Sequence, residues 1–581
     1  MNIPLKRYWE LLVDHLRVQR GRFALLTGLL LGSIGLQVVN PQLMRYFIDA
    51  ATGAGSHTNL TWIALAFMVM AVVQQVVAVS ATYVGENVAW TATNALRADL
   101  ARHCLNLDMS FHNDKSPGEL IERIDGDVAE LSNFFSQLVI RVIGNLLLLV
   151  GILFALCFED WRIGVAFTLF ATLTVYSLNR VRSIAVPYEK ALREIQADLF
   201  GFLEERLAGT EDIRSNGAEN FVMRGLYRLH TTMLERWRKA WSMHLVVRFT
   251  AGILLMVGYA IAFLFGYHLY RQGVLTIGTA YLIVYYTNLL ARPIRELTQQ
   301  VESLQNIGAA VERLSELKQI ESRIKDGPGV AIPDGPLALE FKDVSFGYAQ
   351  DDRVLKDLSF RLEPGTVLGL LGRTGSGKTT LARLVFRLYD PTAGAVFLDG
   401  ADLRESRVRA LRRRVAMVTQ DVQLFRASVR DNLTFFNRDI PDERILAVIE
   451  DLELGDWYRA LPEGLDTELE TGGRSLSAGQ GQLLAFARVF LHDPGLVILD
   501  EASSRLDPAT EQLIERTVDK LLQNRTAIVV AHRLGTVHRA DDILILEDGS
   551  ITEYGDRQRL AADPRSRFSG LLKTGLSEVL A

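Results

Sequence analysis

Six stretches of this chain are long and apolar enough to cross a lipid bilayer, whose hydrocarbon core takes about 20 helical residues to span. They lie near residues 23–48, 60–88, 135–157, 161–182, 248–270 and 275–297. Backbone polar groups find no water inside a bilayer, so each stretch is predicted to be a helix. Residues 23–317 are therefore predicted to form an all-α transmembrane domain. A chain of 581 residues is long enough for at least one further domain.

The connections between these stretches alternate between short and long. The segments near 49–59, 158–160 and 271–274 are short, whereas 89–134 and 183–247 are long and rich in Arg, Glu and Lys. The positive-inside rule places the long connections, and both termini, in the cytoplasm. Each long connection has a helical pattern with a short break, which predicts a helical hairpin extending past the membrane. Solvated loops are the alternative.

Residues 1–22 combine apolar side chains with basic flanks, which predicts an amphipathic helix on the cytoplasmic face of the membrane. A signal peptide is disfavoured, because the next apolar run lacks a small-residue cleavage site and is followed by further spans. A formal net charge of −5 argues against nucleic acid as a partner. Cys104 and Cys157 match no metal-binding spacing and are interpreted as ordinary apolar residues.

From residue 318 to 336 the helical pattern gives way to Gly, Pro and Asp, which predicts a linker. Residues 337–581 then alternate short β-rich runs with helical patterns, as expected for a soluble α/β domain. The predicted strands cover 337–346, 366–371, 395–398, 414–418, 496–499, 526–530 and 542–546. The expected architecture is a six-helix membrane domain with long cytoplasmic helical extensions, followed by an α/β P-loop ATPase domain.

One glycine-rich stretch lies between a predicted buried strand and a predicted helix. In that context Gly-x4-Gly-Lys-Thr is a phosphate-binding loop, because glycines let backbone N–H groups and the helix N-terminus face the anion. Lys378 is expected at the β- and γ-phosphates of a nucleotide, and the Thr379 hydroxyl at Mg²⁺. The candidate contacts are Gly372, Arg373, Thr374, Gly375, Ser376, Gly377, Lys378, Thr379 and Thr380.

A second apolar strand, 496–499, leads into Asp500 and Glu501. Beside a phosphate loop, Asp500 is expected to hold Mg²⁺ through water, and Glu501 to orient and polarise the attacking water. Ser477 is predicted to cap a further helix, with Gly479 leaving room for a ligand. Because the chain already has one phosphate loop, this helix N-terminus is expected to complete a site on another chain.

These residues resemble the motifs of ATP-binding cassette (ABC) proteins. Residues 372–379 are similar to the Walker A motif, 496–501 to the Walker B motif with its catalytic glutamate, and 476–480 to the ABC signature. Further similarities are Gln420 to the Q-loop, Asp507 to the D-loop, His532 to the switch histidine, Tyr348 to an aromatic that stacks on adenine, and 470–473 to a loop typical of exporters. Six spans followed by one cassette resemble an ABC exporter half-transporter of the bacterial multidrug or lipid type.

The resemblance implies an ATPase that works as a dimer, with each ATP between the Walker A motif of one chain and the signature of the other. Glu501 would activate water, and His532 would hold the γ-phosphate in the transition state. Gln420 would sense nucleotide and the membrane domain together and would contact Mg²⁺. The remaining nucleotide contacts implied in this way are Tyr348, Asp507, Ser477, Gly479 and Gln480. The breaks near 116–120 and 210–216 would be coupling helices.

Two departures from the family pattern concern the signature. Ala478 replaces the first glycine of Leu-Ser-Gly-Gly-Gln, and Gly481 replaces the basic residue that usually follows, whereas Glu501 is intact. Heterodimeric bacterial exporters often combine such a chain with a partner that shows the reverse. The resemblance therefore implies a heterodimer in which this chain supplies Walker A, Glu501 and His532 to the active site. A homodimer with two equivalent sites is the alternative.

The expected function is ATP-driven export or flipping of a hydrophobic or amphipathic substrate (a drug, a lipid or a peptide), because no ring of charge in the spans suggests an ionic one. The expected location is the inner (cytoplasmic) membrane, with the ATPase domain in the cytoplasm. An ATP-gated channel or regulator is an alternative of another class, which the intact Glu501 and His532 disfavour. A soluble P-loop ATPase is disfavoured by the six spans. Polar residues in the spans either line a cavity or bond between helices: Gln37, Asn40, Gln74, Gln75, Tyr285, Tyr286 and Asn288.

Overall fold

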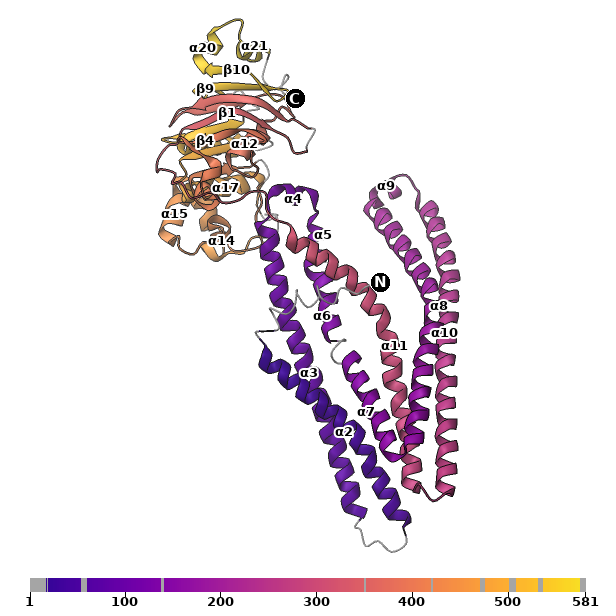
Figure 1. Ribbon diagram of the computed structural model, residues 1–581. Helices are drawn as coiled ribbons and strands as arrows, with labels where there is room; N and C mark the ends of the chain where they lie inside the picture. The colour runs from indigo at the N-terminus through magenta and orange to yellow at the C-terminus, as the bar shows by residue number, and fades with distance from the viewer. Residues whose placement is uncertain are drawn as a thin grey trace. The chain divides into compact units, whose positions relative to one another are not determined.

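The computed structural model describes residues 17, 19–53, 60–136, 141–349, 352–419, 422–470, 476–500, 508–530 and 537–574, with side chains at all of these except 134–136, 298–306, 508–509 and 574. The chain forms two compact units (Figure 1): a helical unit, Met1–Leu105 with Pro117–Ile320, and an α/β unit, Asn106–Ser116 with Glu321–Ala581. Several sequence predictions lie outside the described residues: the surface helix over residues 1–16, and Gln420, Glu501, Asp507 and His532.

The described part of the helical unit is built from helices. They are α2 (Arg20–Thr52), α3 (Leu60–Asn106), α5 (Pro117–Ile121), the π-helix η1 (Glu122–Asp127), α6 (Val128–Ser136), α7 (Gly144–Glu159), α8 (Trp161–Ala208), α9 (Thr210–Ser215), α10 (Glu219–Arg271) and α11 (Ile277–Gln319). Among the described residues, five helices are long and apolar enough to cross a membrane: Arg20–Thr52, Leu60–Asn106, Arg141–Glu159, Trp161–Ala208 and Glu219–Arg271. The sixth predicted span falls in α11, where Arg292, Arg295 and Glu296 make the helix less apolar.

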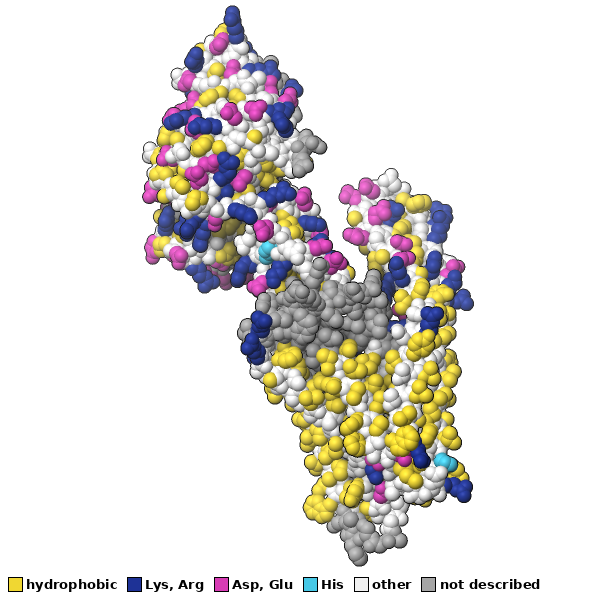
Figure 2. Space-filling view, viewed as in Figure 1, with side chains coloured by type: hydrophobic (Ala, Val, Ile, Leu, Met, Phe, Trp, Pro, Cys, Tyr) yellow, Lys and Arg dark blue, Asp and Glu magenta, His cyan; other side chains and the backbone are white. Residues whose placement is uncertain are grey.

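Apolar side chains hold these helices together and also face outwards. α8 packs along α10, and α11 packs against α2, α7 and α10 (Figure 1). Their shared core includes Phe167, Leu282 and Tyr286, all fully buried. Hydrophobic side chains also cover much of the visible surface of these helices (Figure 2), where water would be an unfavourable neighbour and lipid is not. The unit is therefore a helical transmembrane domain.

Polar side chains join three helices where α2 and α7 end and α11 begins. The Glu159 carboxylate accepts hydrogen bonds from Arg45 at 2.5 Å and from Gln42 at 3.1 Å. Gln42 also donates to the Tyr286 hydroxyl at 3.4 Å, and this hydroxyl donates to the Val38 carbonyl oxygen at 2.7 Å. These bonds satisfy polar groups that would be costly to bury without partners.

At the same end of the bundle, Asp49 holds α2 against the start of α11. Its carboxylate accepts hydrogen bonds from the Thr276 hydroxyl and the Gly278 backbone N–H, both at 2.8 Å. A Cβ at Gly278 would lie 2.5 Å from the Arg45 carbonyl oxygen, so this close approach requires glycine. We call the following side chains the end network: Gln42, Arg45, Asp49, Glu159, Thr276 and Tyr286.

Short helices interrupt both long connections. The break predicted near 210–216 contains α9, at the tip of the α8–α10 hairpin (Figure 1). In the first long connection the helices are interrupted at residues 107–108 and 115–116, on either side of the short helix α4 (Met109–Asp114), and α5 begins at Pro117, within the range predicted for the break. Asp108 caps α4, and Pro117, which has no N–H to leave unbonded, begins the next helix instead of ending one. Although residues 106–116 lie inside the range 23–317, they cluster with the α/β unit.

Besides α4, the α/β unit contains ten described strands: β1 (Leu339–Phe346), β2 (Leu355–Leu362), β3 (Val367–Leu371), β4 (Ala393–Leu398), β5 (Ala401–Asp402), β6 (Val415–Val418), β7 (Leu496–Asp500), β8 (Thr526–Val530), β9 (Asp542–Glu547) and β10 (Ser550–Asp556). Its described helices are α12 (Lys378–Val385), η3 (Leu403–Glu405), α13 (Val408–Arg414), α14 (Val429–Thr434), α15 (Asp442–Asp451), α16 (Gly455–Arg459), η4 (Gly464–Asp466), α17 (Ala478–His492), α18 (Pro508–Leu522), α20 (Arg557–Ala562) and α21 (Arg567–Thr574). Every predicted strand is present, whereas β2, β5 and β10 were not predicted.

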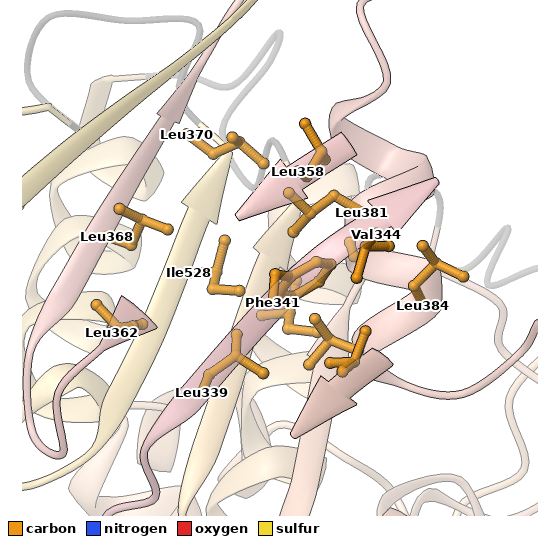
Figure 3. Packing of buried hydrophobic residues seen from close by; sticks show 14 of the residues in the cluster. Leu339, Phe341, Val344, Leu358, Leu362, Leu368, Leu370, Leu381, Leu384 and Ile528 are labelled. Carbon is orange, nitrogen blue, oxygen red and sulfur yellow. The ribbon is translucent and has the colours of Figure 1, made fainter. Parts of the chain in front are cut away.

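These strands form two sheets that share one core. One sheet has the order β2-β1-β4-β5 and is antiparallel; the other has the order β10-β9-β3-β8-β7-β6, in which β9, β3, β8, β7 and β6 run parallel. Buried side chains from both sheets and from α12 pack together, among them Phe341, Leu381 and Ile528 (Figure 3). Because the carboxyl ends of parallel strands meet at one edge, the segments that follow β3, β6, β7 and β8 begin close together.

Candidate functional site

The loop from Gly372 to Gly377 joins β3 to α12 and follows a path that favours glycine. Gly372, Gly375 and Gly377 have φ angles of 151°, 83° and 105°, in the region that side chains rarely adopt. A Cβ at Gly372 would lie 2.3 Å from the Leu546 carbonyl oxygen, and one at Gly377 would lie 2.5 Å from Leu355 Cδ2. Since α12 begins directly afterwards, its unbonded N–H groups face the loop, as in an anion-binding turn.

The Lys378 ammonium lies within this loop. Its Nζ donates to the Gly372 carbonyl oxygen at 2.6 Å and to the Arg373 carbonyl oxygen at 3.0 Å, and the residue is 6% exposed. Ser376 Oγ is also buried, and no described protein group hydrogen-bonds to it. A charged phosphate is a stronger partner for an ammonium group than a neutral carbonyl. The loop therefore holds a cation in position for an incoming phosphate.

Thr379 and Asp500 are 121 positions apart in the chain and meet at this loop. The Thr379 hydroxyl donates to Asp500 Oδ2 at 3.3 Å. Hydroxyl and carboxylate oxygens suit Mg²⁺, which takes few protein ligands when substrate phosphates and waters complete its shell. The pair fits that ion. The described residues contain no group of three or more His, Cys, Asp or Glu side chains that could hold a metal.

The other predicted catalytic residues follow strands that end beside this pair. β6, β7, β8 and β3 are consecutive neighbours, and the register places Asp500 opposite Val530, the last residue of β8. The ends of β6, β7 and β8 therefore lie at the edge of the sheet that carries the phosphate loop. Gln420, Glu501 and His532 follow these strands in the sequence but lie outside the described residues, so their roles remain predictions.

Tyr348, the predicted adenine contact, lies against the start of α12. Its hydroxyl hydrogen-bonds with the Thr380 hydroxyl at 3.1 Å and accepts a hydrogen bond from Arg383 at 3.1 Å. The ring packs edge-on against Phe346 and Tyr389 and is 39% exposed. This exposure leaves ring area on which a base can stack.

Tyr389 joins this corner to α4, within the α/β unit. Asn113 donates to the Tyr389 hydroxyl at 2.7 Å, and Asp108 accepts a hydrogen bond from the Arg323 backbone N–H at 2.6 Å. Burial favours the protonated form of Asp108, but the hydrogen bonds from Arg323 and from the first turn of α4 outweigh burial and hold its pKa below the usual value. The sequence does not single out these contacts, because their partners come from distant positions.

The predicted signature helix is α17, and its first turn is closed by a capping box. Ser477 Oγ accepts from the Gln480 backbone N–H at 3.2 Å, and Gln480 Oε1 accepts from the Ser477 backbone N–H at 3.0 Å. The predicted cap at Ser477 is therefore present, and the Gln480 side chain completes the capping box at the start of α17. Gly479 is buried, whereas Ala478 is exposed at the helix N-terminus. Asp507 lies outside the described residues.

A cavity of about 560 Å³ lies in the helical unit between α2, α3, α7 and α11. Of the polar residues considered in the sequence, Gln37 lines it, whereas Tyr286 belongs to the end network. Its lining also includes four charged side chains: Glu86, Arg141, Arg292 and Glu296. The sequence shows no ring of charge in the spans, and these four residues were not singled out from it. These charges are scattered in the sequence, and the only available signal was that each lies towards the cytoplasmic end of its span.

Two family descriptions match this chain: "ABC transporter transmembrane region" over residues 23–294 and "ABC transporter" over residues 355–504. The Bacillus subtilis ATP-binding/permease protein YgaD, whose name assigns it to multidrug export, is 31% identical over 567 residues, which cover 94% of this chain and 95% of YgaD. The chain belongs to the ABC transporter family. An ATP-dependent lipid A-core flippase of Photorhabdus laumondii is 29% identical over 526 residues, or 89% of each protein.

A solved bacterial Atm1-family ABC exporter with ATP bound matches the fold of this ABC transporter. The TM-score is 0.80 at 23% sequence identity, over 96% of this chain and 99% of the other. The predicted recognition, fold class and enzyme class are confirmed. The protein is an ABC half-transporter of the exporter type, which binds ATP and couples its hydrolysis to transport across a membrane. Such half-transporters act as dimers.

Proposed function

We propose that this ABC exporter moves a hydrophobic or amphipathic substrate (a drug, a lipid or a peptide) across a bacterial inner membrane. The cavity of the helical unit supports the proposal, because its lining combines apolar and polar side chains. The names of the relatives agree with it, since they describe multidrug export and lipid A-core flipping. The observation that carries the proposal is the approach of Thr379 to Asp500, which brings a carboxylate suited to Mg²⁺ to the phosphate loop, in a chain that also carries membrane helices.

In the proposed ATP site, each motif has one role. Lys378 and the loop N–H groups bind the β- and γ-phosphates, while Tyr348 stacks on adenine. Thr379 and Asp500 hold Mg²⁺ with Gln420 as a further ligand, and the ion neutralises phosphate charge. Glu501 activates the attacking water and His532 holds the γ-phosphate. The signature and Asp507 act across the dimer on the nucleotide. The common edge of the parallel strands supports this grouping.

We further propose that the second half-transporter is a different chain. The support is the altered signature, with Ala478 and Gly481 in place of the usual residues, next to an intact Glu501. The Cβ of Ala478 is exposed at the helix N-terminus, where a nucleotide held by the partner would approach. In this arrangement one site hydrolyses ATP quickly, and the site that contains Ala478 does so slowly or not at all.

The proposed topology keeps the termini and the ATPase domain in the cytoplasm. The proposed domain boundaries are a surface helix at 1–22, a transmembrane domain at 23–317, a linker at 318–336 and an ATPase domain at 337–581. α4 and α9 are the proposed coupling helices. For α4 the support is its contacts with Tyr389 and Arg323 of the α/β unit.

The experiment that tests the dimer is mass spectrometry of the native complex, purified from its membrane in detergent, with both chains sequenced. A second chain with an intact signature and a replaced Walker B glutamate would support the heterodimer. A complex of two identical chains would contradict it and would mean that Ala478 is tolerated in both sites.

The experiment that tests the catalytic assignment is Glu501→Gln in the purified complex. We expect ATP binding to persist and turnover to fall by at least about a hundredfold, since the general base is lost while the phosphate loop is intact. A turnover equal to that of the unaltered complex would contradict the role of Glu501. Glu511→Gln, in the following helix α18, is a matched control that should keep full activity.

A further inference from the structure

The charged cavity lies towards the cytoplasmic side of the proposed membrane span. On α11, Arg292 is about 22 Å along the helix from Ile277, at about 1.5 Å per residue. A bilayer core is about 30 Å thick, so Arg292 lies in the inner-leaflet half of the core, about 8 Å from the level where the headgroups begin. Apolar side chains of Leu30, Ile34 and Leu148 line the same cavity. The cavity thus offers apolar and charged surfaces to one occupant.

Arg292 and Glu296 differ from ordinary surface charges in their partners. Arg292 lines the cavity and has no hydrogen bond or ion pair with any side chain that the structure describes. Glu296 Oε2 is buried, and no described group donates a hydrogen bond to it. Its nearest cation is Arg141, with Nη1 4.0 Å away, which is too long for a hydrogen bond. The cavity therefore presents the donors of Arg292 and, one helical turn away, a carboxylate oxygen of Glu296 that has a long ion pair with Arg141 but no hydrogen bond from a described group.

We infer that this cavity binds the headgroup of a zwitterionic amphiphile that carries a phosphate and a primary ammonium group. The phosphate oxygens accept hydrogen bonds from two N–H groups of the planar Arg292 guanidinium. The ammonium N–H groups donate hydrogen bonds to the Glu296 carboxylate. The inference deepens the proposed export function and rests on it for the direction of transport. Two arginines and two glutamates line the cavity, so their formal charges cancel and favour neither a net anion nor a net cation.

The hydrogen-bond requirement of Glu296 makes the inference specific. A quaternary ammonium headgroup has the same charge as a primary one but no N–H to donate, and a phosphoglycerol headgroup has no cation at all. The order of affinity expected from the geometry is therefore phosphoethanolamine, then phosphocholine and phosphoglycerol. A difference of one hydrogen bond to a charged group corresponds to at least about tenfold in affinity.

The test measures binding of three short-chain phospholipids with the same fluorescent acyl chain and different headgroups. The full complex, purified in a non-ionic detergent, is titrated without nucleotide, and fluorescence anisotropy reports binding. We expect the phosphoethanolamine lipid to bind at least about tenfold more tightly than the phosphocholine lipid. Equal affinities, or tighter binding of the phosphoglycerol lipid, would overturn the inference.

Two substitutions separate the two halves of the headgroup. Arg292→Ala should weaken all three lipids, because each has a phosphate. Glu296→Gln should weaken the phosphoethanolamine lipid most, because it loses a charge-assisted hydrogen bond, and so abolish its preference over phosphocholine. A preference that survives Glu296→Gln would overturn the assignment of the ammonium site. Arg292→Lys should restore part of the lost binding, and Arg295→Ala, on the same helix but outside the cavity lining, should change nothing.

ATP hydrolysis distinguishes failure of this inference from failure of the proposed function. Basal hydrolysis in each variant reports a folded complex and does not depend on the lipid. If the complex hydrolyses ATP and exports substrate but shows no headgroup preference, the inference about the cavity is overturned and the proposed export function stands. Lipid binding with the expected preference, but no ATP-dependent movement of any lipid or drug in proteoliposomes, would contradict the export proposal alone.

Discussion

Glu159→Gln is expected to loosen the end network while keeping the shape of the side chain. Glu159 is 12% exposed and its partner Arg45 is 30% exposed, so their ion pair is shielded from water more than a surface pair, which contributes about 0–1 kcal/mol. The substitution leaves one acceptor for Arg45 or Gln42 but removes the charge. Loss of one hydrogen bond to a charged group is about 2 kcal/mol, or about thirtyfold in an equilibrium.

The difference of about 2 kcal/mol changes the equilibrium with any state in which α2 separates from α7 and α11. In such a state the end network is broken in the parent protein and in the Glu159→Gln variant alike. Spin labels report the separation if they are placed at Ala51, near the end of α2, and at Gln272, just before α11. The native Cys104 and Cys157 would first be replaced by serine. We expect ATP binding to favour an outward-facing cavity, in which α2 separates from α11 and the distance between the labels is longer. In pulsed electron resonance, Glu159→Gln should populate this longer distance at an ATP concentration several-fold to about thirtyfold lower than in the parent protein.

The matched control is Glu194→Gln. Glu194 is a largely exposed glutamate on α8 that belongs to no part of the end network. Its substitution should leave the distance distribution unchanged at every ATP concentration. If Glu159→Gln gave the same distributions as this control, the end network would not hold the helices together, and the reasoning from burial would be refuted.

Three further predictions concern the α/β unit. Lys378→Ala should weaken ATP binding by at least about tenfold, since a charged phosphate contact is lost, and calorimetric titration measures it; unchanged affinity would contradict the contact. Gly372→Ala should destabilise the loop by several kcal/mol, because the added Cβ would meet a backbone oxygen. Gly375→Ala should cost about 1–2 kcal/mol, because its Cβ would meet no atom. Hydrogen exchange of the α12 amides compares the two variants, and equal effects would refute the steric argument. Asp108→Ala removes the cap of α4 and should cost about 1 kcal/mol, which appears as faster exchange of the α4 amides; unchanged exchange would contradict a role for the cap.

The parts of the fold that the sequence predicts are those whose signal is local. The strand 496–500 is a continuous apolar run because it is buried on both faces of a parallel sheet. The phosphate loop is recognisable because its glycines satisfy backbone constraints within one turn. By contrast, β10 (550–556) was missed because polar residues alternate along an edge strand, and β2 because Lys356 and Asp357 break its apolar pattern.

The contacts that the sequence does not predict depend on residues brought together by the whole fold. The partners of Asn113 and Asp108 are 276 and 215 positions away, and nothing near either residue announces them. The sequence did not predict α4 as a separate helix, and Pro117 occupies the first position of α5, where a proline is compatible with helix formation. The cavity charges were overlooked because each looks like a residue at a membrane boundary when its span is considered alone.

The helix α11 contributes to three of the polar features described in the helical unit. Its start bonds to Asp49, its middle carries Arg292 and Glu296, and near its end Arg313 forms an ion pair with the buried Asp127. The helix is continuous from Ile277 to Gln319, or about 65 Å at about 1.5 Å per residue. On such a rod, the insertion of a single residue would turn everything beyond it by about 100°. The relative orientation of the three contacts therefore depends on the number of residues between them. Deletions or insertions in α11 should be far less tolerated than substitutions.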